Sequence, residues 1–257
     1  MLSDLKYSMV KTIKEIIFRN GEPYLFNGQT LKFKANCSPV KRKYLSDSSD
    51  VVRNDVLQIN YLEVTFKATD ILWDIGSHNG HYAVLAASIV KGENQVFSFE
   101  PDSTARKAQI GTIQLNQFSK KIQLFDFAVG EKDGVIQFMD LGGNANSHII
   151  KNSGPQSENV TVLKCRSLNS LLLELPKPTF IKIDTEGAEI DILKGGSELL
   201  KDTNVKFICE LHPFAWGSFG VEYNEFISIL ESFGRKITLL DDRKKTADLP
   251  YYGTVLF

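Results

Sequence analysis

The chain has 257 residues, of which 42% are hydrophobic and 24% are charged, with a formal net charge of −1. Such a composition predicts a soluble protein with one large domain, or one domain with a small extension. The near-zero net charge disfavours broad binding to nucleic acid, and no stretch reaches the ~20 apolar residues of a membrane-spanning helix.

The three cysteines, Cys37, Cys165 and Cys209, show no spacing typical of metal ligands and are odd in number. A reduced, cytoplasmic location is the simplest account of them. The N-terminus lacks an apolar core followed by a small-residue cleavage site, so we predict no secretory signal peptide.

Residues 1–67 are predicted to form an extension that caps the active-site crevice and helps to select the substrate, ahead of the catalytic domain at 68–257. An amphipathic pattern at 4–18 indicates a helix. This helix should pack on the domain or on a partner subunit, so a homo-oligomer is left open; an anionic membrane surface is the less favoured alternative. Residues 23–26 and 31–35 are predicted to pair as a hairpin.

A second helix is expected at 51–65. Lys41, Arg42 and Lys43 precede it and are expected to be a solvated charge run, with an anion contact to the substrate as the alternative. The apolar side of this helix is expected to be buried, and its members are Val51, Val52, Val56, Ile59 and Leu62.

From residue 70 onward, apolar strands alternate with helical segments, which predicts a mostly parallel sheet. Strands at 135–139 and 160–165 interrupt this alternation and are predicted to form an inserted pair. The polar loop at 142–158 joins them and is expected to be a mobile lid, in which Ser147 and His148 could contact the substrate. The expected strand starts are Asp70, Gln95, Ile122, Thr179 and Val205, with closing strands at 237–240 and 254–257.

Residues 71–82, ILWDIGSHNGHY, predict a strand, a tight glycine turn and a helix N-terminus. Gly76 and Gly80 would let a ligand lie against bare backbone, and the helix offers unpaired N–H groups. Asp74 suits a ligand with an ammonium group, because a carboxylate repels a phosphate. The dinucleotide pattern G-x-G-x-x-G is absent, so S-adenosylmethionine is favoured over NAD.

A second acid ends the next predicted strand. Glu100 lies 20 residues beyond Gly80, where Rossmann-like sheets place the carboxylate that accepts hydrogen bonds from the ribose hydroxyls. Pro101 ends the strand, and Asp102 is predicted to cap the helix that follows.

Asp184, Glu210 and His212 end two later strands and should reach the same crevice, because ligands of doubly wound sheets lie beyond the carboxyl ends of the strands. His212 is the best base by pKa, since an imidazole can be neutral at pH 7. Asp184 is the best by position, and Glu210 could orient His212 or act as the base itself. A divalent metal held by these three is a second route that their spacing does not favour.

Taken together, these segments resemble the FkbM family of S-adenosylmethionine-dependent methyltransferases. The matching motifs are DIGSHNGHY (74–82), FSFEP (97–101), FAVGEKDG (127–134), IKIDTEGAEIDILKG (181–195) and CELH (209–212). The resemblance implies an α/β class I methyltransferase Rossmann-like fold, with a mostly parallel seven-stranded sheet and helices on both faces. It also implies O-methylation of a sugar, glycan or natural product.

The resemblance also assigns roles to individual residues. Of the catalytic candidates Asp184, Glu210 and His212, which strand position and side-chain chemistry suggest, the resemblance places Asp184 opposite the reacting methyl group. The cofactor S-adenosylmethionine would be bound by Asp74, Gly76, Ser77, Asn79, Gly80, Glu100, Pro101, Asp126, Phe127, Ala128 and Asp184.

Three rivals remain in view. The same cofactor turn would serve a methyltransferase that acts on an amine or a carboxylate. It would also serve a non-catalytic protein that only binds a nucleotide. A nucleic-acid amino-methyltransferase is disfavoured, because Asp184-Thr185-Glu186-Gly187 stands where such enzymes carry an Asn/Asp-Pro-Pro-aromatic block.

Overall fold

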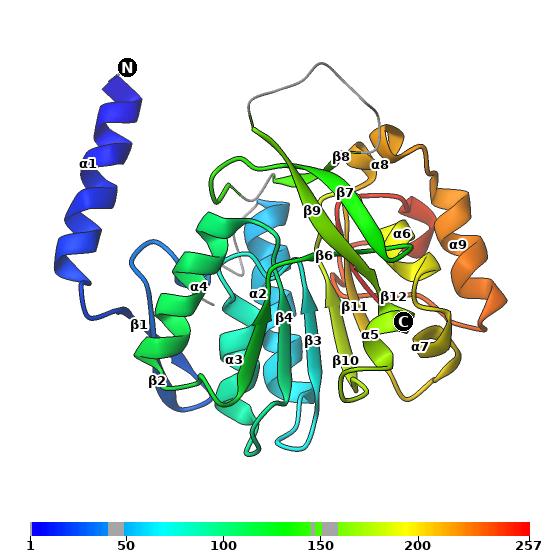
Figure 1. Ribbon diagram of the computed structural model, residues 1–257, viewed down its shortest axis with the longest axis horizontal. Helices are drawn as coiled ribbons and strands as arrows, with labels where there is room; N and C mark the ends of the chain where they lie inside the picture. The colour runs from blue at the N-terminus through cyan, green and yellow to red at the C-terminus, as the bar shows by residue number, and fades with distance from the viewer. Residues whose placement is uncertain (1, 41–48, 145–146, 151–158) are drawn as a thin grey trace.

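The computed structural model describes residues 2–40, 49–144, 147–150 and 159–257 (Figure 1). The predictions for Lys41 to Lys43 and for most of the 142–158 loop therefore lie outside the described residues.

The helices are α1 (Leu2–Ile17), α2 (Asp50–Thr65), α3 (His81–Ile89), α4 (Ser103–Leu115), α5 (Leu168–Leu172), α6 (Glu189–Lys194), α7 (Ser197–Lys201), α8 (Pro213–Phe219) and α9 (Tyr223–Ser232). The strands are β1 (Glu22–Phe26), β2 (Gln29–Phe33), β3 (Leu72–Ile75), β4 (Val96–Phe99), β5 (Ile122–Phe125), β6 (Ala128–Gly130), β7 (Gly134–Met139), β8 (His148–Ile150), β9 (Val160–Ser167), β10 (Phe180–Ile183), β11 (Lys206–Leu211), β12 (Thr238–Leu239) and β13 (Gly253–Leu256).

Seven strands form the main sheet, in the order β12-β13-β11-β10-β3-β4-β5. The five strands from β11 to β5 are parallel, whereas β13 runs antiparallel to both β11 and β12. The prediction of a mostly parallel seven-stranded sheet is confirmed. The carboxyl ends of β3, β4, β10 and β11 meet at one edge, which is where the predicted site residues follow their strands.

Helices cover both faces of this sheet, because the central strands are apolar on both sides and need cover there. On one face the hairpin, α2 and α3 share an apolar cluster with β3 and β10, in which Ile59 of α2 packs with Leu72 and Phe180. On the other face α6, α7 and α9 pack against Trp73, Ile181 and Phe207. The prediction of helices on both faces is confirmed.

The buried side of α2 differs in part from the prediction. Val56, Ile59 and Leu62 are buried, but Val51 is 54% exposed and Val52 is only half-buried. Val51, in the first turn of α2, lines a cavity instead of the core. The polar residues Asn54 and Gln58 are buried in its place.

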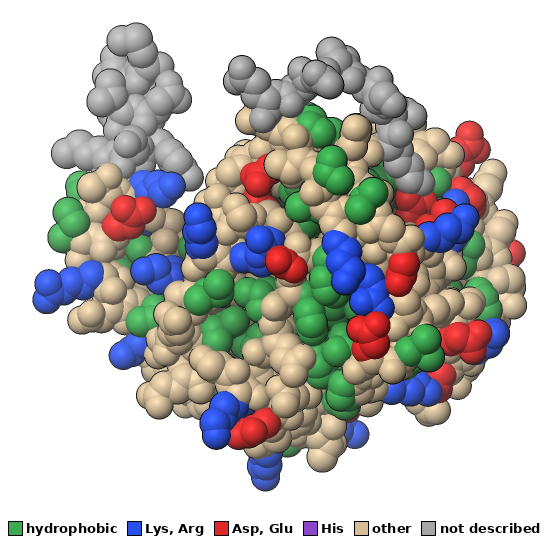
Figure 2. All heavy atoms as spheres, in the orientation of Figure 1, with side chains coloured by type: hydrophobic (Ala, Val, Ile, Leu, Met, Phe, Trp, Pro, Cys, Tyr) green, Lys and Arg blue, Asp and Glu red, His purple; other side chains and the backbone are tan. Residues whose placement is uncertain are grey.

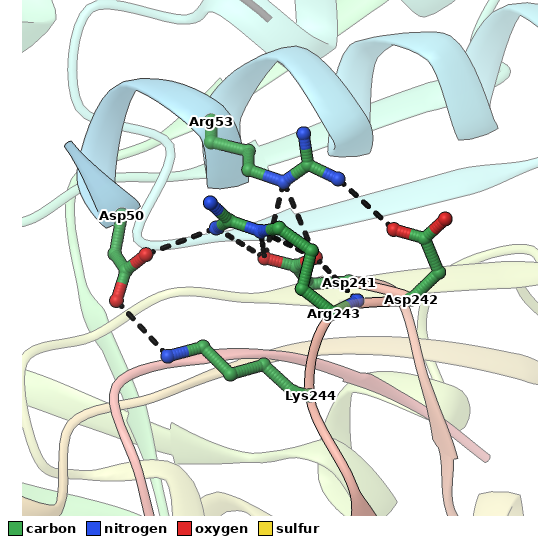
Figure 3. Close-up of polar contacts among 6 residues, drawn as sticks. All are labelled: Asp50, Arg53, Asp241, Asp242, Arg243 and Lys244. Carbon is green, nitrogen blue, oxygen red and sulfur yellow. Dashed lines mark hydrogen bonds and ion pairs between the residues drawn. The ribbon is translucent and has the colours of Figure 1, made fainter. Parts of the chain in front are cut away.

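An ion-pair network fastens the start of α2 to the segment between β12 and β13 (Figure 3). The Arg53 guanidinium donates to both carboxylate oxygens of Asp241 at 3.2 Å and to Asp242 at 2.9 Å. Asp50 accepts from Arg243 at 3.0 Å and from Lys244 at 3.1 Å. The network therefore holds α2 beside the segment that leads to Tyr252.

The inserted region is larger than the predicted strand pair. It is a four-stranded sheet in the order β6-β9-β7-β8, and β7 pairs antiparallel with both β8 and β9. β6 and β8 have only three residues each, too few for an alternating pattern to be recognised. His148, which was predicted to lie in the loop, is the first residue of β8.

Helix α1 stands apart from the sheet (Figure 1). Four of its apolar side chains, Val10, Ile13, Ile16 and Ile17, are 44–68% exposed, so the expected packing on the domain is not seen. A partner subunit or a membrane surface remains a prediction. Within the described residues, no helix is both long and apolar enough to cross a bilayer. On the face that Figure 2 shows, basic and acidic side chains are interspersed.

Candidate active site

A cavity of about 520 Å³ opens at the carboxyl edge of the main sheet. Its walls come from the ends of β3, β4, β10 and β11, from α2, from the four-stranded sheet and from Tyr252. The structure thus brings together most of the predicted site residues. Those that line the cavity are Gly76, Ser77, Glu100, Pro101, Phe127, Ala128, Asp184, Glu210 and His212.

The glycine turn after β3 forms the floor of the cavity. The backbone N–H groups of Gly76 and Ser77 both donate to the Phe99 carbonyl oxygen, at 3.0 and 3.1 Å. Gly76 has a φ of +74°, and a Cβ built there would lie 1.8 Å from the Asp184 carbonyl oxygen. Only glycine fits, since both the backbone conformation and the space exclude a side chain.

Four predicted cofactor residues lie outside the cavity lining: Asp74, Asn79, Gly80 and Asp126. Asp126 is exposed on the surface. Asp74 is fully buried behind the turn, where its Oδ2 accepts from the Ala83 N–H of α3 at 3.1 Å. Its Oδ1 has no hydrogen-bond partner among the described residues. Burial raises the pKa of Asp74 to about 6, against the lowering effect of Lys182.

Glu100 follows β4 and is 6% exposed. Its Oε2 accepts from the His78 N–H at 2.6 Å, and its Oε1 accepts from the Asp102 N–H at 2.8 Å. Burial raises the pKa of this carboxyl to about 7. Each oxygen has a second lone pair, so the carboxylate can also accept from a ligand in the cavity.

Asp102 links α4 to the inserted region. Its Oδ1 accepts from two N–H groups of the first turn of α4, at 2.8 and 2.9 Å, which confirms the predicted cap. Its Oδ2 accepts from the Gly143 N–H at 2.8 Å and from the Ser147 hydroxyl at 2.9 Å. The His78 ring lies 3.0 Å from the Gly143 carbonyl oxygen. The described part of the predicted lid is therefore held against the glycine turn.

Asp184 follows β10 and faces the far side of the same cavity. Its Oδ2 accepts from the Lys182 ammonium at 2.8 Å. Lys182 is 3% exposed on a buried strand, and its ammonium also lies 4.3 Å from the centre of the Tyr82 ring. Burial alone would raise the pKa of Asp184, but Lys182 and His212 outweigh it and hold that pKa below its usual range.

His212 follows β11 and is oriented by Glu189 of α6. The Nδ1 atom of its ring lies 2.8 Å from Glu189 Oε1. Glu189 is fully buried and also accepts from the Trp216 indole N–H at 2.7 Å and the Gly187 N–H at 2.9 Å. This contact fixes the ring so that Nε2 points into a group of carboxylates. The hypothesis that Glu210 orients His212 is wrong, because Glu189 takes that place.

The surroundings of His212 do not favour the neutral imidazole that was predicted to serve as a base. Burial alone would lower its pKa, but the hydrogen bond to Glu189 and the charges of Glu189, Asp184 and Glu186 raise that pKa to about 10. In the absence of a cation this direction favours the protonated imidazole, which does not meet the condition for a free base at neutral pH; a metal ion bound at Nε2 would take the place of that proton.

Glu210 is 4% exposed and held from two sides. Its Oε1 accepts from the Tyr252 hydroxyl at 2.5 Å, and its Oε2 accepts from the Gln58 amide at 2.5 Å. Burial and the nearby Asp184 raise the pKa of this carboxyl. Gln58 lies on α2, and Tyr252 lies on the segment whose residues 241–244 form ion pairs with α2. The ion-pair network therefore joins the two segments that carry the partners of Glu210.

Sequence reasoning missed four residues of this site. Asp55 of α2, Lys182 and Tyr252 line the cavity, and Glu189 lies behind it. Lys182 could have been recognised from the sequence, because a lysine in the middle of an apolar strand is buried and needs an acidic partner nearby. Asp55 and Tyr252 gave none, because they come from distant segments.

Comparison with known proteins places these residues in a family. The model of the family described as the Methyltransferase FkbM domain matches residues 74–237. Hexuronic acid methyltransferase AglP from Haloferax volcanii is 28% identical over 146 residues, which cover 56% of each chain. The chain thus matches only about half the length of this curated relative.

The solved structures include methyltransferase FkbM from Methylobacillus flagellatus KT, with 16% identity and a TM-score of 0.50. The match covers 84% of this chain and 56% of that one. At this identity the likeness bears on the fold, which is that of class I methyltransferases, as predicted.

Proposed function

This chain belongs to the FkbM methyltransferase domain family, and we propose that it is an S-adenosylmethionine-dependent enzyme that methylates a hydroxyl oxygen of a sugar or glycan. The observation that carries the proposal is the convergence of Glu100, Asp184, Glu210 and His212 on one cavity at the carboxyl edge of the sheet.

The cavity residues near β4 fit the cofactor. Glu100 would accept from the ribose hydroxyls through the lone pairs that its backbone donors leave free. Pro101, Phe127 and Ala128 give an apolar wall that suits an adenine ring. Asp74 would act through the turn that it holds in place, since it does not reach the cavity wall.

When bound, S-adenosylmethionine supplies an electrophilic methyl group and a leaving sulfur that needs no proton. The chain must therefore position the acceptor in line with that methyl group and draw off the acceptor's proton. Asp184, Glu210 and His212 are proposed to position the acceptor, and the carboxylates Asp184 and Glu210 are the candidates among them to take its proton. Lys182, Tyr252, Gln58 and Glu189 keep their side chains in place.

The acceptor is proposed to be a hydroxyl rather than a carboxylate. Lys182 is the single lysine or arginine that lines the cavity within the described chain, whereas six carboxylates line it: Asp55, Glu100, Asp102, Asp184, Glu186 and Glu210. An anionic acceptor group would be repelled by these charges. The relative AglP, by its name, acts on a hexuronic acid; this supports a saccharide acceptor here, but a hexuronic acid carries both hydroxyls and a carboxylate, so the choice of the hydroxyl depends on the charge of the cavity alone.

The N-terminal extension at 1–67 is proposed to contribute to the acceptor wall. Val51 and Asp55 of α2 line the cavity, close to the end of β11 that Gln58 contacts. Substitutions on this face of α2 should therefore change acceptor preference more than cofactor affinity.

A methyl-transfer screen tests the proposed function. The purified chain would be incubated with S-adenosylmethionine carrying a labelled methyl group and a panel of nucleotide sugars, hexuronic acids and glycans. We expect label in a saccharide as an alkali-stable methyl ether. An alkali-labile methyl ester would contradict the hydroxyl assignment, and label that enters only amines would contradict the saccharide class.

A further inference from the structure

We propose that Asp184, Glu210 and His212 form a binding site for one divalent cation of the oxygen-preferring class, Mg²⁺ or Mn²⁺. One potential ligand atom from each residue lies within 4.8 Å of the other two. The inference extends the proposed function, because it assigns to these residues the way in which they would act on an acceptor oxygen.

The side chains of the group lie near enough to one another to reach one cation. His212 Nε2 lies 3.8 Å from Asp184 Oδ1, 3.8 Å from Glu210 Oε1 and 3.6 Å from Glu186 Oε1. These distances are too long for hydrogen bonds. Two ligands of one octahedral cation with bonds of about 2.1 Å lie about 3.0 Å apart when adjacent and about 4.2 Å apart when opposite. The observed separations exceed the value for adjacent ligands by about 0.6–0.8 Å, so these side chains would draw together by small rotations to bind one cation.

The imidazole is the independent observation. His212 is 1% exposed, and its Nε2 has no hydrogen-bond partner among the described residues, although Nδ1 is held at 2.8 Å by Glu189. A histidine that binds a metal through one nitrogen usually donates the other N–H to a carboxylate. The fully buried Glu189 provides this partner.

The carboxylates of Asp184 and Glu210 are also held in place by neighbouring side chains. In each of them one oxygen faces His212. Lys182 holds Asp184 through Oδ2, while Oδ1 faces the imidazole. Gln58 holds Glu210 through Oε2, while Oε1 faces both His212 and the Tyr252 hydroxyl. Two carboxylates with one imidazole, and no thiolate, are ligands that suit Mg²⁺ or Mn²⁺.

A cation here would offset the negative charge of the carboxylates that line the cavity, and it would act as a Lewis acid. An acceptor hydroxyl that binds the cation is more acidic, because the metal stabilises the alkoxide, and its proton would pass to a cavity carboxylate that is not a ligand, Asp55 or Glu186. The site opens onto the cavity through Asp184 and Glu210, so an acceptor oxygen can reach it.

The test measures Mn²⁺ binding to the full chain, without cofactor or acceptor, by titration calorimetry and electron paramagnetic resonance. We expect one Mn²⁺ per chain and a Kd at least tenfold higher in Asp184→Asn and Glu210→Gln. Glu93→Gln, which alters an exposed carboxylate outside the cavity, is the matched control and should bind like the wild type. Equal affinity in all four proteins, or no binding at millimolar Mn²⁺, would overturn the proposal.

A spectroscopic measurement decides the matter even if the variants do not fold. Pulsed resonance spectra of wild-type protein with Mn²⁺ should show coupling to one imidazole nitrogen, and spectra without it would overturn the site. The test is independent of the proposed function. Mn²⁺ binding without methyl transfer to any saccharide would refute only that function, whereas full-rate transfer under a chelator with no Mn²⁺ bound would refute only the cation site.

Discussion

Gly76→Ala is expected to destabilise the protein by about 3 kcal/mol or more and to abolish binding of S-adenosylhomocysteine. The new Cβ would lie 1.8 Å from the Asp184 carbonyl oxygen and 2.8 Å from its carbonyl carbon. Neither strand end can yield, because Asp184 donates its N–H to the Ile75 carbonyl oxygen at 3.0 Å. Urea unfolding and calorimetric titration measure the two effects.

Gly28→Ala is the matched control for this substitution. Gly28 has a φ of +71°, close to that of Gly76, but a Cβ there meets nothing within 4 Å. The control shares the backbone strain without the clash and should cost only about 1 kcal/mol. Equal stability of the two variants would mean that the close approach of β3 and β10 at Gly76 is not as described.

Glu189→Gln is expected to lower the rate of methyl transfer by about 10–100-fold while leaving the affinity for S-adenosylhomocysteine unchanged. Glu189 is a positioning residue, since it holds His212 at 2.8 Å and does not line the cavity. Its replacement by an amide removes the charge that fixes which ring nitrogen faces Asp184 and Glu210. The measurement is kcat for transfer, together with the Kd for S-adenosylhomocysteine.

Glu198→Gln provides the comparison for this prediction, because Glu198 is exposed and pairs only with Lys201 in the described structure. It should leave both constants unchanged. A Glu189→Gln enzyme with normal kcat would show that the orientation of His212 does not matter for turnover. A loss confined to cofactor affinity would instead indicate a general disturbance of the sheet edge.

Much of the fold could be predicted from the sequence, because each central strand is an apolar run that ends in an acid. Glu100, Asp184, Glu210 and His212 reached the cavity as expected for the carboxyl edge of a parallel sheet. The short strands β6 and β8 were missed, since three residues carry no readable period.

The contacts that tune the site could not be predicted, because they join segments far apart in the chain. Gln58 and Glu210 are 152 positions apart, and Tyr252 meets Glu210 across 42. The pKa of His212 depends on Glu189 of α6 and on Asp184 and Glu186 after β10, so no local pattern indicates its rise. For Asp74 the sequence motif was clear but the contact was not. Asp74 was predicted to bind the cofactor, whereas its Oδ2 accepts from the Ala83 N–H of α3 behind the cavity wall.

Titration of S-adenosylhomocysteine into wild type, Glu100→Ala and the exposed-residue variant Glu93→Ala tests the central claim, that the cavity at the carboxyl edge of the sheet holds the cofactor with Glu100 at its ribose. We predict one site per wild-type chain, no measurable binding to Glu100→Ala, and wild-type affinity in Glu93→Ala. We also expect the wild-type affinity to fall as the pH drops below about 7, where the buried Glu100 carboxyl gains a proton. Undiminished binding to Glu100→Ala would contradict the account.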